Sequence, residues 1–142
     1  MLWSPSGAST AALAGAPLTA TGGVETSFIP RVAGSAEQLV AENDAILIAL
    51  PGYGHKPVFD ALAPHLRDGQ HVIISSHASF GAVYLMQLCA ARGVTPTITA
   101  WGTTAVTGRR GEGASVKVNT VRKKVDLCTV PEDSSEEALA LC

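Results

Sequence analysis

A short apolar run that ends in a proline–glycine turn constrains the fold of this chain more than any other feature. Residues 45–50 are continuously apolar, and the turn residues 51–54 (Pro-Gly-Tyr-Gly) follow at once. A short apolar run bounded by turn residues is typical of a strand that is buried on both faces, as in a parallel sheet covered by helices. The sequence therefore predicts an interior strand at residues 45–50.

The same pattern continues along the chain. Residues 57–66 carry apolar side chains at helical spacing, with Pro57 suited to the first helical position. Further elements are predicted as a strand at 71–75, a helix from about 80 to 92 and a strand at 97–101. The buried face of that second helix is expected to carry Val83, Met86, Cys89 and Ala90, with Gly93 as its cap. This alternation predicts an α/β fold with a Rossmann-type, mostly parallel sheet.

The flanking segments predict smaller elements. Residues 35–38 (Ser-Ala-Glu-Gln) match a capping box, and Gly22 and Gly23 separate two β-compatible stretches that we expect to form a hairpin. Residues 1–3 have the composition of a strand end. Residues 108–113 are expected to form a turn, and the strands predicted at 114–119 and 125–130 to pair antiparallel, which gives an antiparallel C-terminal extension. A helix is predicted to begin near Ser134.

Composition excludes several classes of function. Apolar residues make up 46% of the 142 residues, charged residues 15%, and the formal net charge is −2. This balance gives no electrostatic footprint for nucleic acid or an acidic membrane, so neither partner is expected. Three cysteines without CxxC spacing favour a reducing, cytoplasmic compartment, and the four histidines lack metal-ligand spacing, so no metal site is expected.

Several motifs, taken in order, resemble the opine dehydrogenases. They are the "strand, Pro, three residues, His" segment ending at His55, residues 62–70, residues 80–82 (Phe-Gly-Ala), residues 116–119 and residues 125–131. Together they span nearly the whole chain. Ketopantoate reductase and glycerol-3-phosphate dehydrogenase share the Pro-x-x-x-His segment, so their reactions are alternatives within the same superfamily.

The resemblance implies an enzyme that uses NAD or NADP as cofactor and small molecules as substrates. Its members condense a 2-oxo acid with the amino group of an amino acid and reduce the imine with hydride. They have a second, helical domain that supplies the catalytic His and its acidic partner, so the catalytic residues are expected outside this chain. Residues 1–131 would then be a partial NAD(P)-binding Rossmann domain, and residues 132–142 would begin a helix leading into the second domain.

The family's GxGxxG turn has only partial matches in this chain, at residues 52–54 and 111–113. The sheet is therefore expected to be incomplete at its N-terminus, with that turn just upstream of Met1. An isolated chain of this kind should bind the dinucleotide weakly and be inactive. Whether the short chain is a real product or a truncated gene model is left open, as is a third hypothesis, a non-catalytic Rossmann-like binding module.

Candidate site residues follow the predicted strands, because ligands of open α/β sheets bind at the carboxyl ends of strands. Leu50, Pro51, Gly52 and Tyr53 are candidates for cofactor contact; the alternative is a plain turn in which His55 caps the helix. Ser76 is a further cofactor candidate and His77 a substrate candidate, and a structural role for both remains open. A hydrolytic Ser–His pair is disfavoured because adjacent strand residues point to opposite faces and no GxSxG motif is present.

The remaining candidates lie farther apart. Thr103 and Thr104 follow the third strand, where the resemblance implies the substrate entrance. Trp3 and Ser4 would lie beside the adenine ribose, and no acidic residue is present before Thr21 to bind its hydroxyls, which leaves NAD and NADP open. Arg109 and Arg110 could meet a carboxylate, although a solvated turn is the favoured interpretation.

Overall fold

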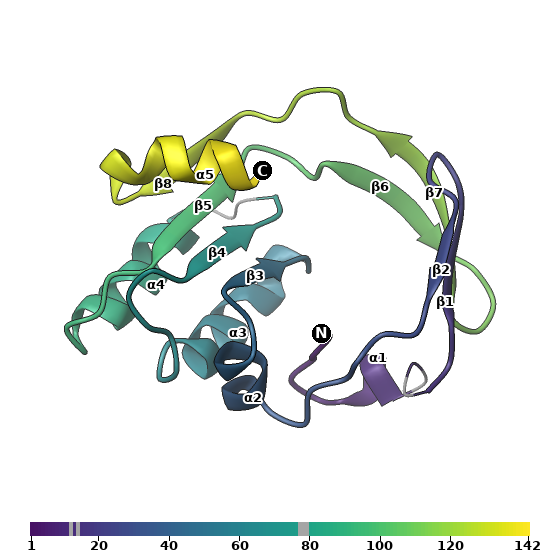
Figure 1. Cartoon of the computed structure of the whole chain (residues 1–142), viewed down its shortest axis with the longest axis horizontal. Helices are drawn as coiled ribbons and strands as arrows, with labels where there is room; N and C mark the ends of the chain where they lie inside the picture. Colours follow the sequence, from purple (N-terminus) through teal and green to yellow (C-terminus); the bar gives the residue numbers. More distant parts are fainter. Residues whose placement is uncertain (12, 14, 77–79) are drawn as a thin grey trace. The chain divides into compact units, whose positions relative to one another are not determined.

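The computed structural model describes residues 1–11, 13, 15–76 and 80–142 and divides into two compact units. The first unit comprises residues 1–39 and 105–124, and the second comprises residues 40–104 and 125–142. Each unit is therefore built from two separate segments of the chain, which the reader can trace by colour from purple to yellow in Figure 1.

The second unit contains the predicted α/β sheet. Its strands β3 (Ala45–Ile48), β4 (His71–Ile74), β5 (Thr97–Trp101) and β8 (Leu127–Val130) are hydrogen-bonded in that order. β3, β4 and β5 run parallel, and β8 pairs antiparallel with β5. Parallel neighbours need crossover connections, which here contain α3 (His55–Leu62) and α4 (Gly81–Ala90). The structure thus confirms a mostly parallel sheet with an antiparallel addition near the C-terminus.

The core of the second unit lies between this sheet and α3. Val58, Phe59 and Leu62 of α3 are each at most 4% exposed, and they recur at the helical spacing seen in the sequence. The sheet contributes buried isoleucine and valine residues, namely Ile46, Ile48, Val72, Ile74 and Ile98. Nε2 of buried Gln70 donates to the carbonyls of Val40 and Asn43, both at 2.9 Å, and so fixes the chain ahead of β3 to the turn before β4.

The first unit is built on a second sheet. Its strands are β1 (Leu18–Gly22), β2 (Thr26–Phe28), β6 (Val106–Arg110) and β7 (Ser115–Val121), in the order β2-β1-β7-β6. β1 and β2 form the predicted hairpin, and a parallel bridge between Leu2 and Val32 confirms the strand-like start. A short helix, α1 (Ala8–Ala11), precedes β1 in the sequence.

The two remaining helices are short. α2 (Ala36–Ala41) has the expected capping box, because Ser35 Oγ accepts from Gln38 N at 3.0 Å and Gln38 Oε1 accepts from Gly34 N at 2.9 Å. In the usual capping box the side chain bonds to the N–H of the N-cap residue itself; here Gln38 bonds to the N–H of Gly34, one residue earlier. Near the C-terminus, a 3₁₀ turn over Glu132–Ser134 leads into α5 (Ser135–Leu141), whose Ala138 is fully buried.

The prediction that the strands near residues 114–119 and 125–130 pair with each other is wrong. β7 pairs with β1 and β6, whereas β8 pairs with β5 in the other sheet. β-propensity and alternation indicate that a segment is extended, but they do not name its partner when both strands have other edges available.

The predicted turn at residues 108–113 begins too early. Residues 106–110 form β6, with a register shift between Thr107 and Gly108. A Cβ atom on Gly108 would lie 2.8 Å from the Lys117 carbonyl oxygen, so this glycine marks a close backbone approach inside a strand.

Three further details differ from the sequence predictions. β3, the edge strand of its sheet as described, alternates in burial with Leu47 55% exposed, so one of its faces is open and the other is covered. The buried residues of α4 are Leu85 and Cys89, whereas Val83 is 44% exposed; α4 is apolar on most sides, so periodicity alone gives no orientation. α3 begins at His55, which makes Pro57 its third residue, still within the first turn where no N–H partner is lost.

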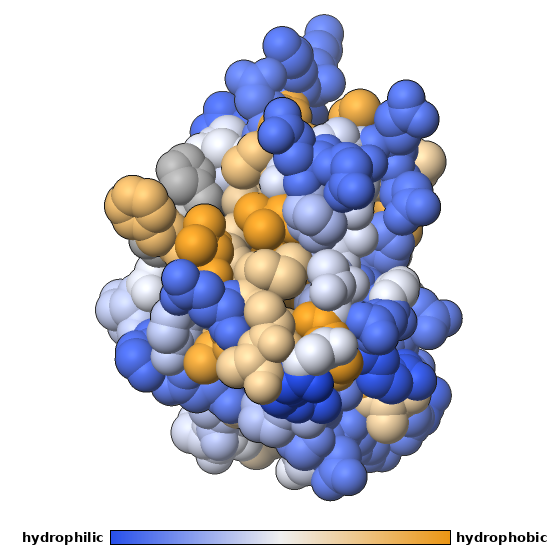
Figure 2. Space-filling view, turned by 90° about the vertical axis from the view of Figure 1, so that its left-hand side faces the viewer, coloured by the Kyte–Doolittle hydropathy of each residue, from blue (hydrophilic) through white to orange (hydrophobic). Residues whose placement is uncertain are grey.

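Apolar residues also gather on the surface. Figure 2 shows the side on which α4, α5 and β8 lie in Figure 1, and there an apolar band is bordered by hydrophilic residues.

None of the helices formed by the described residues has the length and apolar character needed to cross a membrane.

Candidate functional site

The carboxyl ends of β3, β4 and β5 meet at one edge of the second unit's sheet. Their registers align Ile48 with Ile74 and Ile74 with Ala100, so the loops that follow begin side by side. Open α/β sheets bind ligands at this edge. The structure therefore brings together the candidates after β3, β4 and β5.

The loop after β3 presents its residues to solvent. Leu50 is half-buried, Pro51 is extended (φ −59°, ψ 147°), and a 3₁₀ turn covers Gly52–Gly54. Gly54 N donates to the Pro51 carbonyl at 2.8 Å, and the Tyr53 side chain is 90% exposed. Among the described residues, none accepts a hydrogen bond from the backbone N–H of Gly52 or Tyr53. Two donors that have no acceptor among the described residues thus stand at the start of a helical segment, an arrangement that suits an anionic group.

The buried His55 side chain lies against the start of this loop. Its side chain is 2% exposed, and its Nε2 lies 3.0 Å from the Leu50 carbonyl oxygen. His55 does not cap the helix, because it is the first residue of α3 and Gly54 occupies the cap without a side-chain bond. The imidazole instead bonds back to the strand end and holds the turn in shape. A plain turn stays the alternative to cofactor contact.

The start of the loop after β4 is tied to the end of β3. Ser75 N donates to the Ile48 carbonyl at 3.0 Å, and Ser75 itself is buried. Ser76 is half-buried and has a φ of +72°, a left-handed conformation that few side chains adopt. Such strained residues gather at functional sites. His77 lies outside the described residues.

The loop after β5 is bonded to Asp126, the residue that precedes β8. Gly102 N donates to the Asp126 carbonyl at 2.8 Å, and Thr103 and Thr104 are half-buried. A hollow of about 190 Å³ nearby is lined by Ala100, Gly102, Asp126, Leu127 and Cys128. Neither threonine is among the residues that line that hollow.

The candidates of the first unit are described within that unit. Trp3 and Ser4 are half-buried, and Ser4 Oγ lies 3.4 Å from Thr10 Oγ1. Arg109 and Arg110 are exposed on β6, with Arg109 directly opposite Lys117 of β7. They are therefore strand residues and not part of the expected turn.

The cysteines and histidines form no metal centre in the part of the chain that the structure describes. Cys89 is fully buried, and this burial raises the pKa of its thiol, as for a structural cysteine. Cys128 and Cys142 are exposed.

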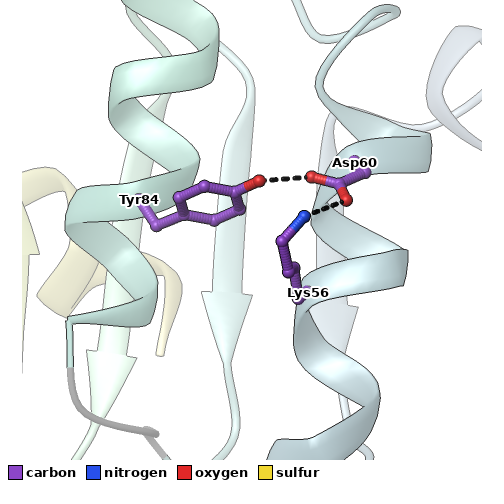
Figure 3. Close-up of polar contacts among 3 residues, drawn as sticks. All are labelled: Lys56, Asp60 and Tyr84. Atoms are coloured by element: carbon purple, nitrogen blue, oxygen red, sulfur yellow. Dashed lines mark hydrogen bonds and ion pairs between the residues drawn. The ribbon is translucent and has the colours of Figure 1, made fainter.

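A polar cluster on α3 and α4 was missed by the sequence reasoning. Lys56 Nζ lies 2.7 Å from Asp60 Oδ2, and the Tyr84 hydroxyl donates to Asp60 Oδ1 at 2.6 Å (Figure 3). The spacing of Lys56 and Asp60 is a detectable helical pair. Tyr84 comes from another helix, and no sequence pattern joins it to them.

Comparison with known proteins identifies similar structures but no similar sequences. No family model matches the chain, and no curated protein matches it. An octopine dehydrogenase with NADH and L-arginine aligns with a TM-score of 0.70 and 17% identity over 84% of this chain and 32% of its own. A yersinopine dehydrogenase with NADP+ aligns with a TM-score of 0.64 and 15% identity over 80% of this chain and 29% of its own.

A putative 2-dehydropantoate 2-reductase from Enterococcus faecalis is also similar. It aligns with a TM-score of 0.63 and 17% identity over 99% of this chain and 44% of its own. This chain thus spans about a third of the dehydrogenase structures and under half of the reductase. The resemblance to opine dehydrogenases drawn from the motifs is confirmed at the level of the fold: the chain has the α/β fold that these dehydrogenase and reductase structures share with it.

Proposed function

We propose that this chain is the nucleotide-binding part of an NAD(P)-dependent oxidoreductase of the opine dehydrogenase type. The observation that carries the proposal is the loop after β3, where the N–H groups of Gly52 and Tyr53, which have no acceptor among the described residues, stand at the carboxyl edge of a parallel sheet. Backbone donors at a helical N-terminus bind phosphate groups, and a dinucleotide contains two of them. The similar octopine and yersinopine dehydrogenases were determined with NADH and NADP+ respectively.

Each candidate residue has a role in this proposal. Pro51 directs the chain away from β3, and Gly52, which has no side chain, lets the backbone approach the dinucleotide bridge. Tyr53 and Ser76 contact the nicotinamide side, and Trp3 and Ser4 contact the adenine ribose. His77, Thr103 and Thr104 lie on the substrate side. NAD and NADP both remain candidates, because the similar structures include one with each.

The proposed reaction is the reductive condensation of a 2-oxo acid with an amino acid: water would leave as the amine and the carbonyl form the imine, and the dinucleotide, when bound, would supply the hydride that reduces it. Residues 1–131 bind the dinucleotide, and residues 132–142 lead into a further domain that carries the catalytic histidine and its acidic partner. The share of the similar dehydrogenases that this chain covers, 32% and 29%, supports this division. A second candidate is reduction of a 2-oxo acid without amine, supported by the 99% coverage of this chain by the reductase-like structure.

The proposal is tested by titrating the chain with NADH and NADPH and following energy transfer from Trp3 and Trp101 to the nicotinamide. A saturable signal is expected for at least one of them. Gly52→Val should abolish it, because a branched side chain blocks the backbone approach, whereas Gly34→Val, whose added Cβ meets only the Gln38 side chain at 3.7 Å, should leave it unchanged. A signal that never saturates, or that both variants reduce equally, would contradict the proposal.

A further inference from the structure

The charges of the chain are divided unevenly between its two units. The first unit carries seven lysine and arginine residues against three acidic residues, a net charge of +4. The second unit carries three against nine, a net charge of −6. Charges farther apart than about 8 Å are largely screened at physiological ionic strength, so a surface responds to its local charge. The net charge of −2, from which no nucleic-acid partner was expected, therefore conceals a basic unit.

Most of this positive charge lies on β6 and β7 and in the residues that follow them. Residues 109–124 contain six of the chain's ten lysine and arginine residues, and Glu112 is the one acidic residue in that range. All six basic residues are exposed. They are Arg109, Arg110, Lys117, Arg122, Lys123 and Lys124.

The pairing of the strands sorts the side chains of this sheet into two faces. Residues in register on neighbouring strands point to the same face, and every second residue of a strand returns to it. One face, which we call the polar face, carries Thr19, Thr21, Ser27, Arg109, Ser115 and Lys117. The opposite face carries Leu18, Ala20, Phe28, Val116 and Val118. The sheet is thus apolar on one side and polar on the other.

Two positive charges lie side by side on the polar face. Arg109 of β6 is directly opposite Lys117 of β7, and like charges in this position repel each other. Neither side chain has an ion-pair or hydrogen-bond partner among the described residues. Basic residues can protect an edge strand such as β6 from pairing, but β7 lies between β1 and β6. Edge protection therefore does not explain Lys117, whereas an anion bound to both residues would relieve their repulsion.

The composition of the polar face limits which anionic partner fits it. Its six side chains offer hydroxyl, ammonium and guanidinium groups, and none is apolar, aromatic or acidic. The cores of protein–protein interfaces are apolar, and helices that bind membrane surfaces bury apolar side chains. Lysine, arginine, serine and threonine are among the residues that contact the phosphates and sugars of nucleic acids. Single strands are bound by stacking on aromatic side chains, so a duplex fits this face better.

We propose that the polar face of the first unit binds the phosphodiester backbone of a double-stranded nucleic acid. Arg109 and Lys117 contact phosphates, and the hydroxyl groups of Thr21 and Ser27 donate further hydrogen bonds to the backbone. Residues 122–124 extend the positive charge beyond the end of β7. Contacts of this kind carry no information about base sequence. The proposal does not rest on the proposed oxidoreductase function.

The test follows the fluorescence anisotropy of a short labelled duplex, made as DNA in one arm and as RNA in the other, during titration with the full chain. At least one duplex should bind, and a duplex of shuffled sequence should bind equally well. Raising the salt concentration from about 50 mM to about 200 mM should weaken binding about tenfold, because each of two neutralised phosphates contributes about −0.9 to the slope of log K against log salt. Absence of binding to both duplexes at the lower salt concentration would overturn the proposal.

Two variants locate the contact on the polar face. Arg109→Gln and Lys117→Gln should each make the salt slope shallower by about 0.9, the contribution of one phosphate. Arg67→Gln, which removes an exposed arginine of the second unit, should leave the slope unchanged. Neither polar-face variant should lower the melting temperature, because each removes a repulsion between exposed charges. A slope that changes equally in all three variants, or in none, would overturn the proposal.

Competition distinguishes a nucleic acid from other anionic partners. Polyglutamate and phosphatidylserine vesicles, at equal concentrations of negative charge, should each displace the labelled duplex less than an unlabelled duplex does. Equal or stronger displacement by polyglutamate would assign the polar face to an acidic protein segment. Equal or stronger displacement by the vesicles would assign it to a membrane surface. Either result would overturn the proposal.

Binding of the dinucleotide keeps this proposal separate from the proposed function. Arg109→Gln should bind NADH and NADPH as the wild-type chain does. Loss of dinucleotide binding in this variant would make the polar face part of the dinucleotide site and would overturn the present proposal. If the duplex binds as expected and neither dinucleotide binds, the present proposal stands and the oxidoreductase proposal fails.

Discussion

At the residue scale, His55 does the most to hold the candidate site in shape. Its buried ring bonds to the Leu50 carbonyl at 3.0 Å and packs against Phe59, with ring centroids 5.4 Å apart. Replacing His55 by leucine removes this hydrogen bond, so the Leu50 carbonyl loses its donor. Removing one partner of such a bond costs about 1–3 kcal/mol.

We therefore predict that His55→Leu lowers the free energy of unfolding by about 1–2 kcal/mol, since the loss of the unpaired Nδ1 offsets part of the cost. Urea unfolding followed by circular dichroism measures this. His65→Leu is the control, because His65 is half-buried and outside the site loops. Equal effects of the two variants would show that the His55 bond contributes nothing specific.

The Lys56–Asp60–Tyr84 cluster predicts a dependence of stability on pH. The folded pKa of Asp60 is lowered, first by Lys56 and then by Tyr84, so its contribution is present above the unfolded value of 3.8 and is lost as pH falls through the folded value. Lys56 has a raised pKa, so its contribution is present below 10.5 and is lost as pH rises through its folded value. Both side chains are exposed, so the effect is small and screened by salt.

Asp60→Asn should therefore destabilise the chain slightly at pH 7, and the effect should shrink towards pH 2 as the wild-type carboxyl takes up its proton. Denaturation at both pH values and at two salt concentrations measures this. The variant Asp133→Asn, at an exposed position in the turn before α5, is the control. A difference between wild type and Asp60→Asn that persists unchanged at pH 2 would contradict the assignment.

The sequence located some of the site residues and could not locate others. The apolar run and its turn placed Leu50, Pro51, Gly52 and Tyr53 at a strand end, and the structure confirms that position. Their role as cofactor contacts stays a prediction. Tyr84 lies 24 residues from Asp60 in the sequence, and their contact depends on how two helices pack, which single-sequence periodicity does not describe.

At the scale of elements, strands were easier to predict than their partners. Residues 97–101 form β5 with the predicted bounds, and the predicted hairpin corresponds to β1 and β2. The pairings of β7 with β1 and of β8 with β5 join segments far apart in sequence. Such pairings are fixed by packing of the whole sheet, and local propensity carries no information about them.

The parallel contact between β1 and β7 depends on Gly22, which gives a prediction for one element. Gly22 has a φ of +89°, and an added Cβ would clash with the Val118 carbonyl oxygen. Gly15 has a similar φ of +74° with open space around it. Gly15→Ala should therefore cost about 1 kcal/mol from backbone strain alone, whereas Gly22→Ala should cost roughly 2–3 kcal/mol more.

Thermal unfolding of the two glycine variants measures this difference. A lower midpoint is expected for Gly22→Ala than for Gly15→Ala, because only the former must separate β1 from β7. Equal midpoints would contradict the close contact between the two strands.

At the scale of the whole molecule, the exposed edge strand β3 predicts self-association. Leu47 is 55% exposed on an edge strand whose inward residues Ile46 and Ile48 are buried. The unpaired N–H and C=O groups of an apolar edge strand can pair with a strand of another chain, and a lysine on the edge strand commonly prevents this pairing. Leu47→Lys should therefore increase the monomer fraction in light scattering at high concentration.

The control for that prediction is Val106→Lys, because Val106 is also an exposed strand residue, at 45%, but begins β6 of the other unit. A wild-type chain that is monomeric at all concentrations, or a control that dissociates it equally well, would show that β3 is not the contact.

The central claim is that the carboxyl edge of the β3–β4–β5 sheet binds a nicotinamide dinucleotide, and amide chemical-shift mapping tests it most directly. ¹⁵N spectra of the full chain would be recorded with increasing NADH, and separately with NADPH. The account predicts saturable shifts at Gly52, Tyr53 and Ser76, with Tyr84 of α4 unaffected. Shifts confined to other parts of the chain, or no saturable shift with either dinucleotide, would contradict the account.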